Sequence, residues 1–240
     1  MMRIGLIGYG KMGKAIEEIA LQKGHEIVLK ISDENLEDFT KENVQLCDVA
    51  IEFTGPESAV ANMRMCIDAG VPVVCGSTGW VAHEENIKKY CTEKNGTLLY
   101  ASNFSIGVNI FFEVNKKLAA LMASQKAYNV SIEEIHHTQK KDAPSGTAIT
   151  IAQQIIAERD DKKSWTDHTP ILESEIEIVS KRIDLAPGTH YVKYTSDVDD
   201  IEIIHTAHNR KGFAAGAVVA AEFVAAKKGI FSMKDILQIF

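Results

Sequence analysis

The chain has 240 residues and a mass of 26.4 kDa, a length that fits one large domain or two small ones. Hydrophobic residues make up 45% and charged residues 25%, which argues against a disordered chain, a collagen-like chain and a disulfide scaffold. The net charge of −7 argues against a protein that binds nucleic acid by neutralising phosphates, because such proteins are usually basic.

Two further features bear on the compartment. The apolar run before Gly8 is too short for the core of a secretory signal, and the stretch Ala214–Ala221 is far shorter than the roughly 18 residues that a membrane span needs. The cysteines show no C-x-x-C spacing and are expected to be reduced, mostly buried thiols; they are Cys47, Cys66, Cys75 and Cys91. We therefore expect a cytoplasmic protein.

The first hundred residues alternate between strand-like and helix-like segments. Strands are expected at Arg3–Ile7, Glu26–Ile31, Asp48–Phe53, Val71–Cys75 and Thr97–Tyr100, and helices at Met12–Lys23, Glu57–Asp68 and Val81–Glu93. Strand–helix alternation with short connections predicts an α/β fold with a parallel sheet that helices cover on both faces.

The pattern changes near Asn103. A long helix is expected at Asn109–Ala123, then a strand at Ala127–Ile135, a polar loop at His136–Gly146, a helix at Thr147–Arg159 and a charged surface loop at Asp160–Thr169. Strands follow at Ser174–Lys181, His190–Ser196 and Ile201–His205, and helices at Phe213–Lys228 and Met233–Phe240. Successive strands without helices between them predict a second, mixed-sheet α+β domain.

A glycine-rich turn follows the first strand directly. Gly8, Gly10 and Gly13 fit the dinucleotide pattern G-x-G-x-x-G, with a helix opening inside it. In that pattern the first glycine allows the tight turn, the second lets the backbone approach a pyrophosphate, and the third lets the helix pack closely on the strand. The sequence therefore predicts a Rossmann domain whose cofactor lies against Gly8, Tyr9, Gly10, Lys11, Met12 and Gly13. The alternative is a glycine-rich turn without a ligand.

An acidic residue is expected at the end of the second strand. Asp33 stands there, where a carboxylate would bind the adenine ribose hydroxyls and repel a 2′-phosphate, which favours NADH. Lys11 in the glycine loop could instead reach a 2′-phosphate, so NADPH remains open. Loops at Phe53–Pro56 and Gly76–Gly79 end the third and fourth strands, where their small residues could line the ribose and nicotinamide or simply make turns.

The densest chemistry lies between Glu133 and Ala148. A strand leads into a loop with His136, His137 and Lys140, and the loop ends in Ser145-Gly146-Thr147 at a helix start. The first N–H groups of a helix lack intrahelical partners and favour an anion, and the nearby cations would add charge and exchangeable protons. This arrangement suits a small carboxylate substrate that needs a proton. The alternative is that Ser145 only caps the helix and the histidines are solvated.

The run Glu134–Ala148 resembles the signature of the 4-hydroxy-tetrahydrodipicolinate reductase (dihydrodipicolinate reductase) family, E-x-H-x-x-x-K-x-D-x-P-S-G-T-A, and matches every fixed position. Other segments resemble the family in family order: Gly8–Gly13, Phe53–Thr54, Gly76–Gly79, Asn103–Asn109 and His205–Ala217. The resemblance covers essentially the whole chain.

The resemblance implies a dinucleotide-binding domain from residues 1–103 plus 213–240 and a substrate-binding and oligomerisation domain from residues 104–212, in a homotetramer. It also implies a hinge near Asn103–Phe104 and Arg210–Phe213. The implied activity is the NADH- or NADPH-dependent reduction of 4-hydroxy-tetrahydrodipicolinate to tetrahydrodipicolinate, with loss of water, in lysine biosynthesis through diaminopimelate.

The resemblance assigns roles to single residues. His136 is the expected acid/base group and Lys140 the expected proton donor. The expected substrate ligands are His137, Ser145, Gly146 and Thr147, and further cofactor contacts are expected from Gly76, Ser77, Thr78, Ala101, Ser102, Asn103 and Phe104. We expect no metal, no nucleic-acid partner and no membrane partner. The main alternatives are a related diaminopimelate or amino-acid dehydrogenase and a dinucleotide sensor without activity.

Overall fold

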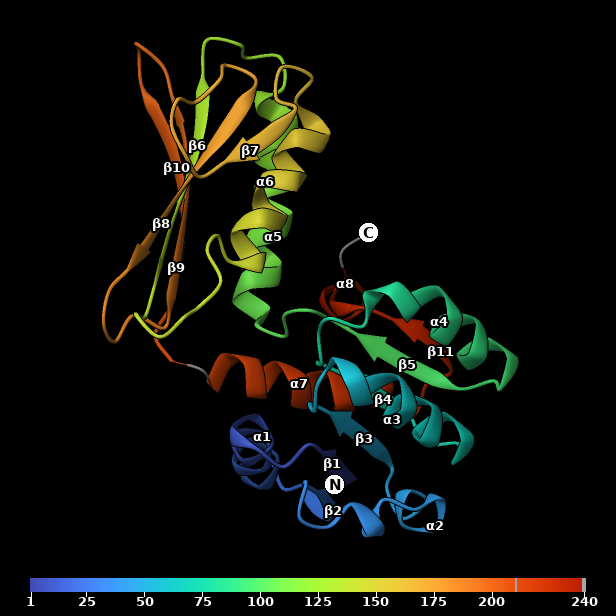
Figure 1. The fold of residues 1–240 in the computed structure, drawn as a ribbon. Helices are drawn as coiled ribbons and strands as arrows, with labels where there is room; N and C mark the ends of the chain where they lie inside the picture. Colours follow the sequence, from blue (N-terminus) through green and yellow to red (C-terminus); the bar gives the residue numbers. More distant parts are fainter. Residues whose placement is uncertain (210, 239–240) are drawn as a thin grey trace. The chain divides into compact units, whose positions relative to one another are not determined.

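The computed structural model describes residues 1–209 and 211–238. The chain divides into two compact units, one made of residues 1–106 and 211–240 and the other of residues 107–210 (Figure 1). Arg210, which the sequence places in a hinge, lies outside the described residues.

The first unit is built on a six-stranded sheet in the order β11-β5-β4-β3-β1-β2. All of its neighbouring strands run parallel. The strands are β1 (Arg3–Ile7), β2 (Glu26–Ile31), β3 (Val49–Glu52), β4 (Val73–Cys75), β5 (Thr97–Tyr100) and β11 (Gly229–Phe231). The chain runs outward from β1 in both directions, so β1 and β3 flank the topological switch point, where open sheets of this kind bind ligands at the carboxyl ends of the strands.

Helices cover both faces of this sheet, as the alternation predicts (Figure 1). Alternate strand residues supply two separate cores. Ile7 and Val73 pack with residues of α2 (Lys41–Val44), α3 (Pro56–Asp68) and α4 (Glu84–Glu93), which follows the 3-10 turn η2 (Val81–His83). Ile4 and Leu6 pack with residues of α1 (Lys11–Gln22), α7 (Lys211–Val224) and α8 (Met233–Leu237).

The second unit is a five-stranded mixed sheet in the order β10-β9-β6-β8-β7. Its central strand β6 (Asn129–His136) runs antiparallel to β9 (Gly188–Thr195) and parallel to β8 (Glu175–Arg182). The edge strands are β7 (Ser164–Thr166) and β10 (Asp200–Ala207). The helices α5 (Ile106–Met122) and α6 (Gly146–Glu158) lie on one side of this sheet (Figure 1). They supply Phe111, Ile151 and Ile155 to a third core with Ile132 and Val192 of the sheet.

The fold corrects several sequence-based assignments. β7 lies within the stretch expected to be a charged loop, and β11 lies in the gap between the two predicted C-terminal helices. The 3-10 turn η1 (Leu36–Asp38) and α2 were not expected. These elements have three or four residues each, too few for a hydrophobic period to show. All four cysteines are free and buried.

Candidate functional site

The glycine loop lines a large cavity in the first unit. The cavity, of about 740 Å³, joins the carboxyl ends of β1 and β3 and is lined by Gly8, Tyr9, Gly10, Lys14, Ser32, Asp33, Glu34 and residues 53–58. It lies at the switch point of the sheet, where the predicted dinucleotide site belongs.

The three glycines divide their work as the motif requires. Gly8 has φ +97°, and a Cβ there would lie 2.2 Å from the carbonyl oxygen of Phe53. A Cβ on Gly13 would lie 2.5 Å from the carbonyl oxygen of Gly8, while a Cβ on Gly10 would meet nothing within 4 Å. Gly8 and Gly13 therefore serve packing, and Gly10 leaves room on the cavity side. No side chain caps α1 at Gly10, which suits a pyrophosphate at this helix start.

The turn after β2 presents acids to the cavity. The Asn35 side chain accepts a hydrogen bond from the Ser32 N–H at 2.8 Å and donates to the carbonyl of Lys30 at 2.9 Å, which shapes the turn that carries Asp33 and Glu34. Lys14 lines the same cavity. Lys11, which the sequence offers as a phosphate ligand, is exposed on α1 and is not among the lining residues.

The remaining predicted cofactor residues lie outside the lining of this cavity. Met12 is half-buried on α1. Ser77 is buried and joins the cavity loop through a 2.9 Å hydrogen bond from the Thr54 N–H to its Oγ, while Gly76 packs directly against the Phe53 ring. Phe104 is buried and stacks obliquely on Phe53 with ring centroids 5.7 Å apart. The other predicted contacts lie in loops after β4 and β5; they are Thr78, Ala101, Ser102 and Asn103.

The polar loop of the second unit connects β6 with α6. Ser145 is the N-cap of α6, and its Oγ accepts a hydrogen bond from the Ala148 N–H at 3.2 Å. Gly146 and Thr147 occupy the first turn, where backbone N–H groups have no intrahelical acceptor. A Cβ on Gly146 would meet nothing within 4 Å. The predicted anion site is therefore an open helix start with a satisfied cap.

Glu134 is the buried hub beneath this helix start. Its carboxylate accepts hydrogen bonds from the Ser145 N–H at 3.1 Å, from the Ser180 hydroxyl at 2.8 Å and from the Arg182 guanidinium at 3.1 Å. Burial alone would raise the pKa of this carboxyl, but the donated hydrogen bonds outweigh burial and hold its pKa far below the usual range. One carboxylate thus ties β6, β8 and the start of α6 together.

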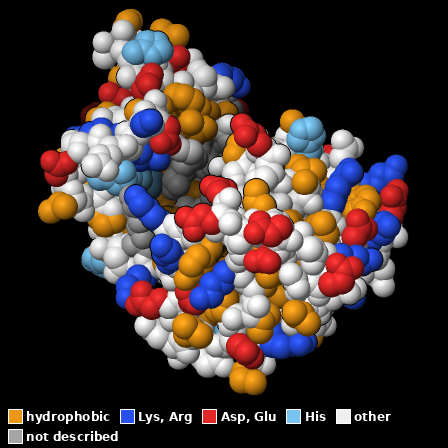
Figure 2. All heavy atoms as spheres, turned by 60° about the horizontal axis from the view of Figure 1, so that its bottom comes forward, with side chains coloured by type: hydrophobic (Ala, Val, Ile, Leu, Met, Phe, Trp, Pro, Cys, Tyr) orange, Lys and Arg blue, Asp and Glu red, His pale blue; other side chains and the backbone are white. Residues whose placement is uncertain are grey.

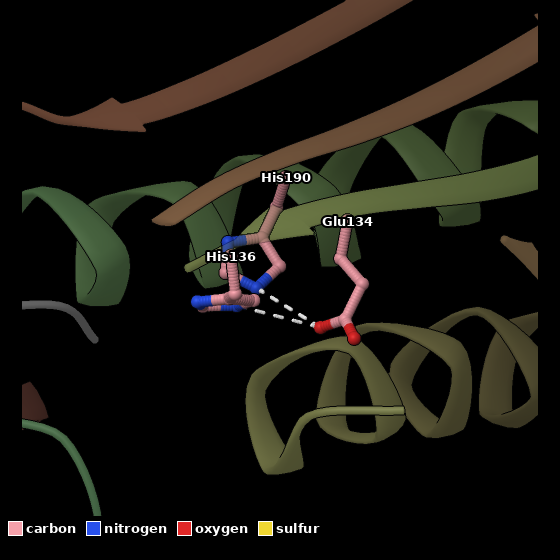
Figure 3. Close-up of side chains that lie close together, drawn as sticks. All are labelled: Glu134, His136 and His190. Carbon is pink, nitrogen blue, oxygen red and sulfur yellow. Dashed lines mark ion pairs between the residues drawn. The ribbon is translucent and has the colours of Figure 1, made fainter. Parts of the chain in front are cut away.

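Two histidines face this carboxylate (Figure 3). The Nε2 atoms of His136 and His190 lie 3.4 Å and 3.9 Å from Oε2 of Glu134. The His136 separation lacks the alignment of a hydrogen bond, and its buried Nε2 has no hydrogen-bond partner among the described residues. His190 Nε2 also lies 3.3 Å from the Ser145 hydroxyl. His136 rests against the backbone of β9, where a Cβ on Gly188 would lie 2.9 Å from its ring.

Lys140 lies further along the loop. Its Nζ is 2.8 Å from both carboxylate oxygens of Asp142, and this contact lowers the pKa of the Asp142 carboxyl. The Asp142 carbonyl accepts a 2.6 Å hydrogen bond from Arg182, which links the Lys140 segment to the Glu134 hub. His137 lines a separate cavity of about 320 Å³ with residues 184–187 and Asn209.

The second unit thus brings His136, Lys140, Ser145, Gly146 and Thr147 into one connected region. Sequence reasoning assigned no role to Glu134 beyond the signature, and it missed Ser180, Arg182 and His190. The register of β6 against β9 would have identified His190 as a neighbour of Glu134, because the two residues pair directly across these strands. A further histidine of this unit, His205 on β10, packs on Phe111 with ring centroids 5.9 Å apart.

His190 predicts a pH dependence of stability. Burial, helped by the neighbouring His136, lowers the pKa of His190 to about 4, while the unfolded residue titrates near 6.5. Between these values the unfolded chain binds the extra proton, so stability falls as the pH drops from about 6.5 to 4. We expect urea unfolding of His190→Gln to lose much of this slope, while the exposed-site control His168→Gln keeps it. An unchanged slope in His190→Gln would contradict the assignment.

Membership of a family rests on comparison of the whole chain with known proteins. The N-terminal model of dihydrodipicolinate reductase matches residues 2–104 and the C-terminal model matches residues 107–237. The chain is 49% identical over 237 residues to 4-hydroxy-tetrahydrodipicolinate reductase of Christiangramia forsetii, covering 98% of each chain. It is 33% identical to the protein of that name from Thermosipho africanus, covering 99% of this chain and 98% of the relative.

Solved structures agree on the fold. Dipicolinate-bound dihydrodipicolinate reductase from Paenisporosarcina sp. TG-14 covers all of both chains with a TM-score of 0.78 at 23% identity. Diaminopimelate dehydrogenase of C. glutamicum shares the fold less closely, with a TM-score of 0.54 at 15% identity over 96% of this chain and 92% of that one. On the matched models and the relatives' identity, the chain belongs to the dihydrodipicolinate reductase family.

Proposed function

We propose that this protein reduces 4-hydroxy-tetrahydrodipicolinate to tetrahydrodipicolinate, with loss of water, using a pyridine nucleotide, in lysine biosynthesis through diaminopimelate. The proposal rests on the open start of α6, which Glu134 anchors. This helix start lies at the end of the polar loop that carries His136 and Lys140. A helix start binds a carboxylate, and two groups that exchange protons accompany it. The family shown by the matched models acts on such a dicarboxylate.

The residues of the second unit divide the work. The N–H groups of Gly146 and Thr147 bind a substrate carboxylate, supported by the Ser145 cap, and His137 binds substrate from the separate cavity that it lines. His136 exchanges a proton with the substrate. Lys140 donates the proton that balances reduction, because the electron pair that develops on the substrate needs a nearby cationic acid.

The cavity of the first unit fits a dinucleotide. The glycine loop supplies a close backbone approach at Gly10, and Asp33 supplies a ribose acceptor. Bound there, reduced nicotinamide would supply a hydride. Gly76–Thr78 and Ala101–Phe104 complete this site as proposed contacts.

We propose a preference for NADH over NADPH. Asp33 and Glu34 both line the cavity beside a single lining lysine, Lys14. Two carboxylates repel a 2′-phosphate, so we expect Asp33→Ser to improve NADPH relative to NADH by about tenfold in kcat/KM, on the order of 1.4 kcal/mol. Kinetics with each nucleotide check this, with Glu37→Ser, an exposed acid outside the cavity lining, as the control. A cofactor ratio unchanged in Asp33→Ser would count against the assignment.

We propose that the reaction needs no metal. Glu134, His136 and His190 place one ligand atom each within 4.8 Å of one another, so the spacing alone would allow a metal ion. The Glu134 carboxylate, however, already accepts from Ser145, Ser180 and Arg182, and the Arg182 charge opposes a cation there. Such a cluster is better suited to holding the helix start than to binding a metal.

The assembly and the compartment also remain proposals. The face of the second sheet away from α5 and α6 exposes Val179 and Ile204, which supports association through this sheet into the homotetramer that the family resemblance implies. Among the described helices, none has the length and apolar character to cross a membrane. The face in Figure 2 intersperses acidic with basic side chains, which supports a protein without a nucleic-acid partner. The four free, buried cysteines support a cytoplasmic location.

A coupled assay tests the function. Aspartate semialdehyde, pyruvate and a dihydrodipicolinate synthase would generate the unstable substrate in place, and nicotinamide absorbance would be followed with NADH and with NADPH. We expect oxidation that depends on the synthase. Folded protein that binds NADH but oxidises neither nucleotide would refute the proposal and favour a dinucleotide sensor. Ammonia-dependent activity on diaminopimelate would favour the related dehydrogenases.

A further inference from the structure

A carboxylate lies buried inside the dinucleotide unit, outside every motif discussed above. Glu52 is the last residue of β3, and its exposed fraction is 0%. In the sheet it stands beside Ile7, the last residue of β1, and Cys75, the last residue of β4. It therefore lies at the carboxyl edge of the sheet, between the strands that lead into the predicted cofactor loops.

The Glu52 side chain only accepts hydrogen bonds. Oε1 accepts from the Thr54 N–H at 3.0 Å, the Ser77 hydroxyl at 3.1 Å and the Asn62 amide at 3.4 Å, and also from the Thr54 hydroxyl. Oε2 accepts from the Cys75 thiol at 3.1 Å. These donors are all neutral groups. Among the described residues, therefore, hydrogen bonds and not a salt bridge hold this carboxylate.

Two of the donor residues, Thr54 and Ser77, belong to loops that approach the cofactor site. Thr54 lies in the loop after β3, which lines the cavity from Phe53 to Ser58. Ser77 lies in the loop after β4, and its Oγ also accepts from the Thr54 N–H at 2.9 Å. A Cβ on Gly76 would lie 2.1 Å from the Phe53 ring, so the loops are packed together as well as hydrogen-bonded.

If this position only ended a buried strand, an apolar side chain would occupy it at a lower cost in free energy than a carboxylate. Burying a carboxylate is costly unless its acceptors are satisfied, and here the donors come from the two loops, from α3 and from β4. We propose that Glu52 is a positioning residue for the dinucleotide. Its side chain holds loops 53–55 and 76–79 together in the conformation that receives the nicotinamide and its ribose. This inference rests on the proposed function, because it needs a pyridine nucleotide in the cavity.

Binding of NADH separates this role from a general effect on stability. Glu52→Leu roughly keeps the volume and removes the acceptor that Thr54 and Ser77 share, so we expect its Kd for NADH, measured by fluorescence titration of the intact chain, to rise about tenfold or more. Glu52→Gln can keep its amide oxygen in the place of Oε1, so we expect its Kd to stay within about threefold of the original chain. The KM for the dicarboxylate substrate should change in neither variant, since its proposed ligands lie in the other unit.

The control is Ile87→Ala, which opens a cavity in the core of the same unit on α4, away from both loops. We expect it to lower the thermal midpoint and leave the Kd for NADH unchanged. If Glu52→Leu does not fold, Asn62→Ala replaces it, because Asn62 donates to Glu52 from α3 and is not a proposed cofactor contact; its Kd should rise by about threefold or more.

The outcomes separate the two proposals. A folded Glu52→Leu variant, or in its place Asn62→Ala, that binds NADH as tightly as the original chain overturns the positioning role alone. An equal rise in Kd for Ile87→Ala also overturns it, because general destabilisation would then explain the effect. An original chain that binds neither NADH nor NADPH overturns the proposed function, and the positioning role falls with it.

Discussion

Replacing Lys140 with alanine is expected to lower kcat by about 10² to 10⁴, the usual range for a group that transfers a proton in the transition state. The physical reason is the loss of the proposed proton donor, which the structure connects, through Asp142 and Arg182, to Glu134 below the α6 start. The Lys140 Nζ pairs with the partly exposed carboxylate of Asp142, so the alanine variant leaves no buried charge without a partner. The fold should therefore survive, and the coupled assay with saturating NADH measures the effect.

The next residue provides a matched control. Lys141 has the same charge, stands beside Lys140 in the chain and is exposed. We expect Lys141→Ala to keep kcat within about twofold, because an exposed lysine contributes only a screened charge. Equal losses in both variants would mean that the loop acts through its overall charge. A Lys140→Ala variant with unchanged kcat would remove Lys140 from the mechanism.

Local patterns were enough to predict much of the first unit. The alternation of strands and helices predicted the parallel sheet covered on both faces, and the structure confirms it. The glycine motif could be recognised in the sequence because it depends on local properties of a strand, a turn and a helix. In the structure Gly8 and Gly13 are close-packed and Gly10 is open. The position of Asp33 followed from the length of β2 and its turn, and Asp33 lines the cavity as expected.

The hidden carboxylates could not be predicted in the same way. The partners of Glu134 come from β8 and α6, up to 48 residues away in the chain, and depend on the register of a mixed sheet. Glu52 looked like an ordinary strand end, since its role appears only when the loops after β3 and β4 meet. The strands β7 and β11 are too short to show a hydrophobic period in the sequence. They are defined by pairing with a neighbouring strand.

Replacing Glu134 with alanine is expected to destabilise the protein by about 3–5 kcal/mol, the usual cost of removing one partner of a buried ion pair. The Ser145 N–H and the Ser180 hydroxyl lose their acceptor, and Arg182, which is only partly exposed, loses its counter-charge. The neighbouring control is Glu133→Ala. Glu133 pairs with Lys181 at 2.7 Å on the exposed side of the same strand, and its loss should cost less than about 1 kcal/mol. Urea unfolding measures both.

The decrease in stability at low pH provides a second test of the Glu134 carboxylate. Its pKa is lowered in the folded protein, so its contribution is complete above the unfolded value of about 4.3 and is lost as the pH falls through the lowered folded value. Glu134→Gln should therefore flatten the fall in stability below about pH 4.3, whereas Glu133→Gln should leave it in place. If Glu134→Gln unfolds in acid with the same slope as the original chain, the Glu134 carboxylate is not the charge that holds the α6 start. The positions of Ser145, Gly146 and Thr147 would then need another cause.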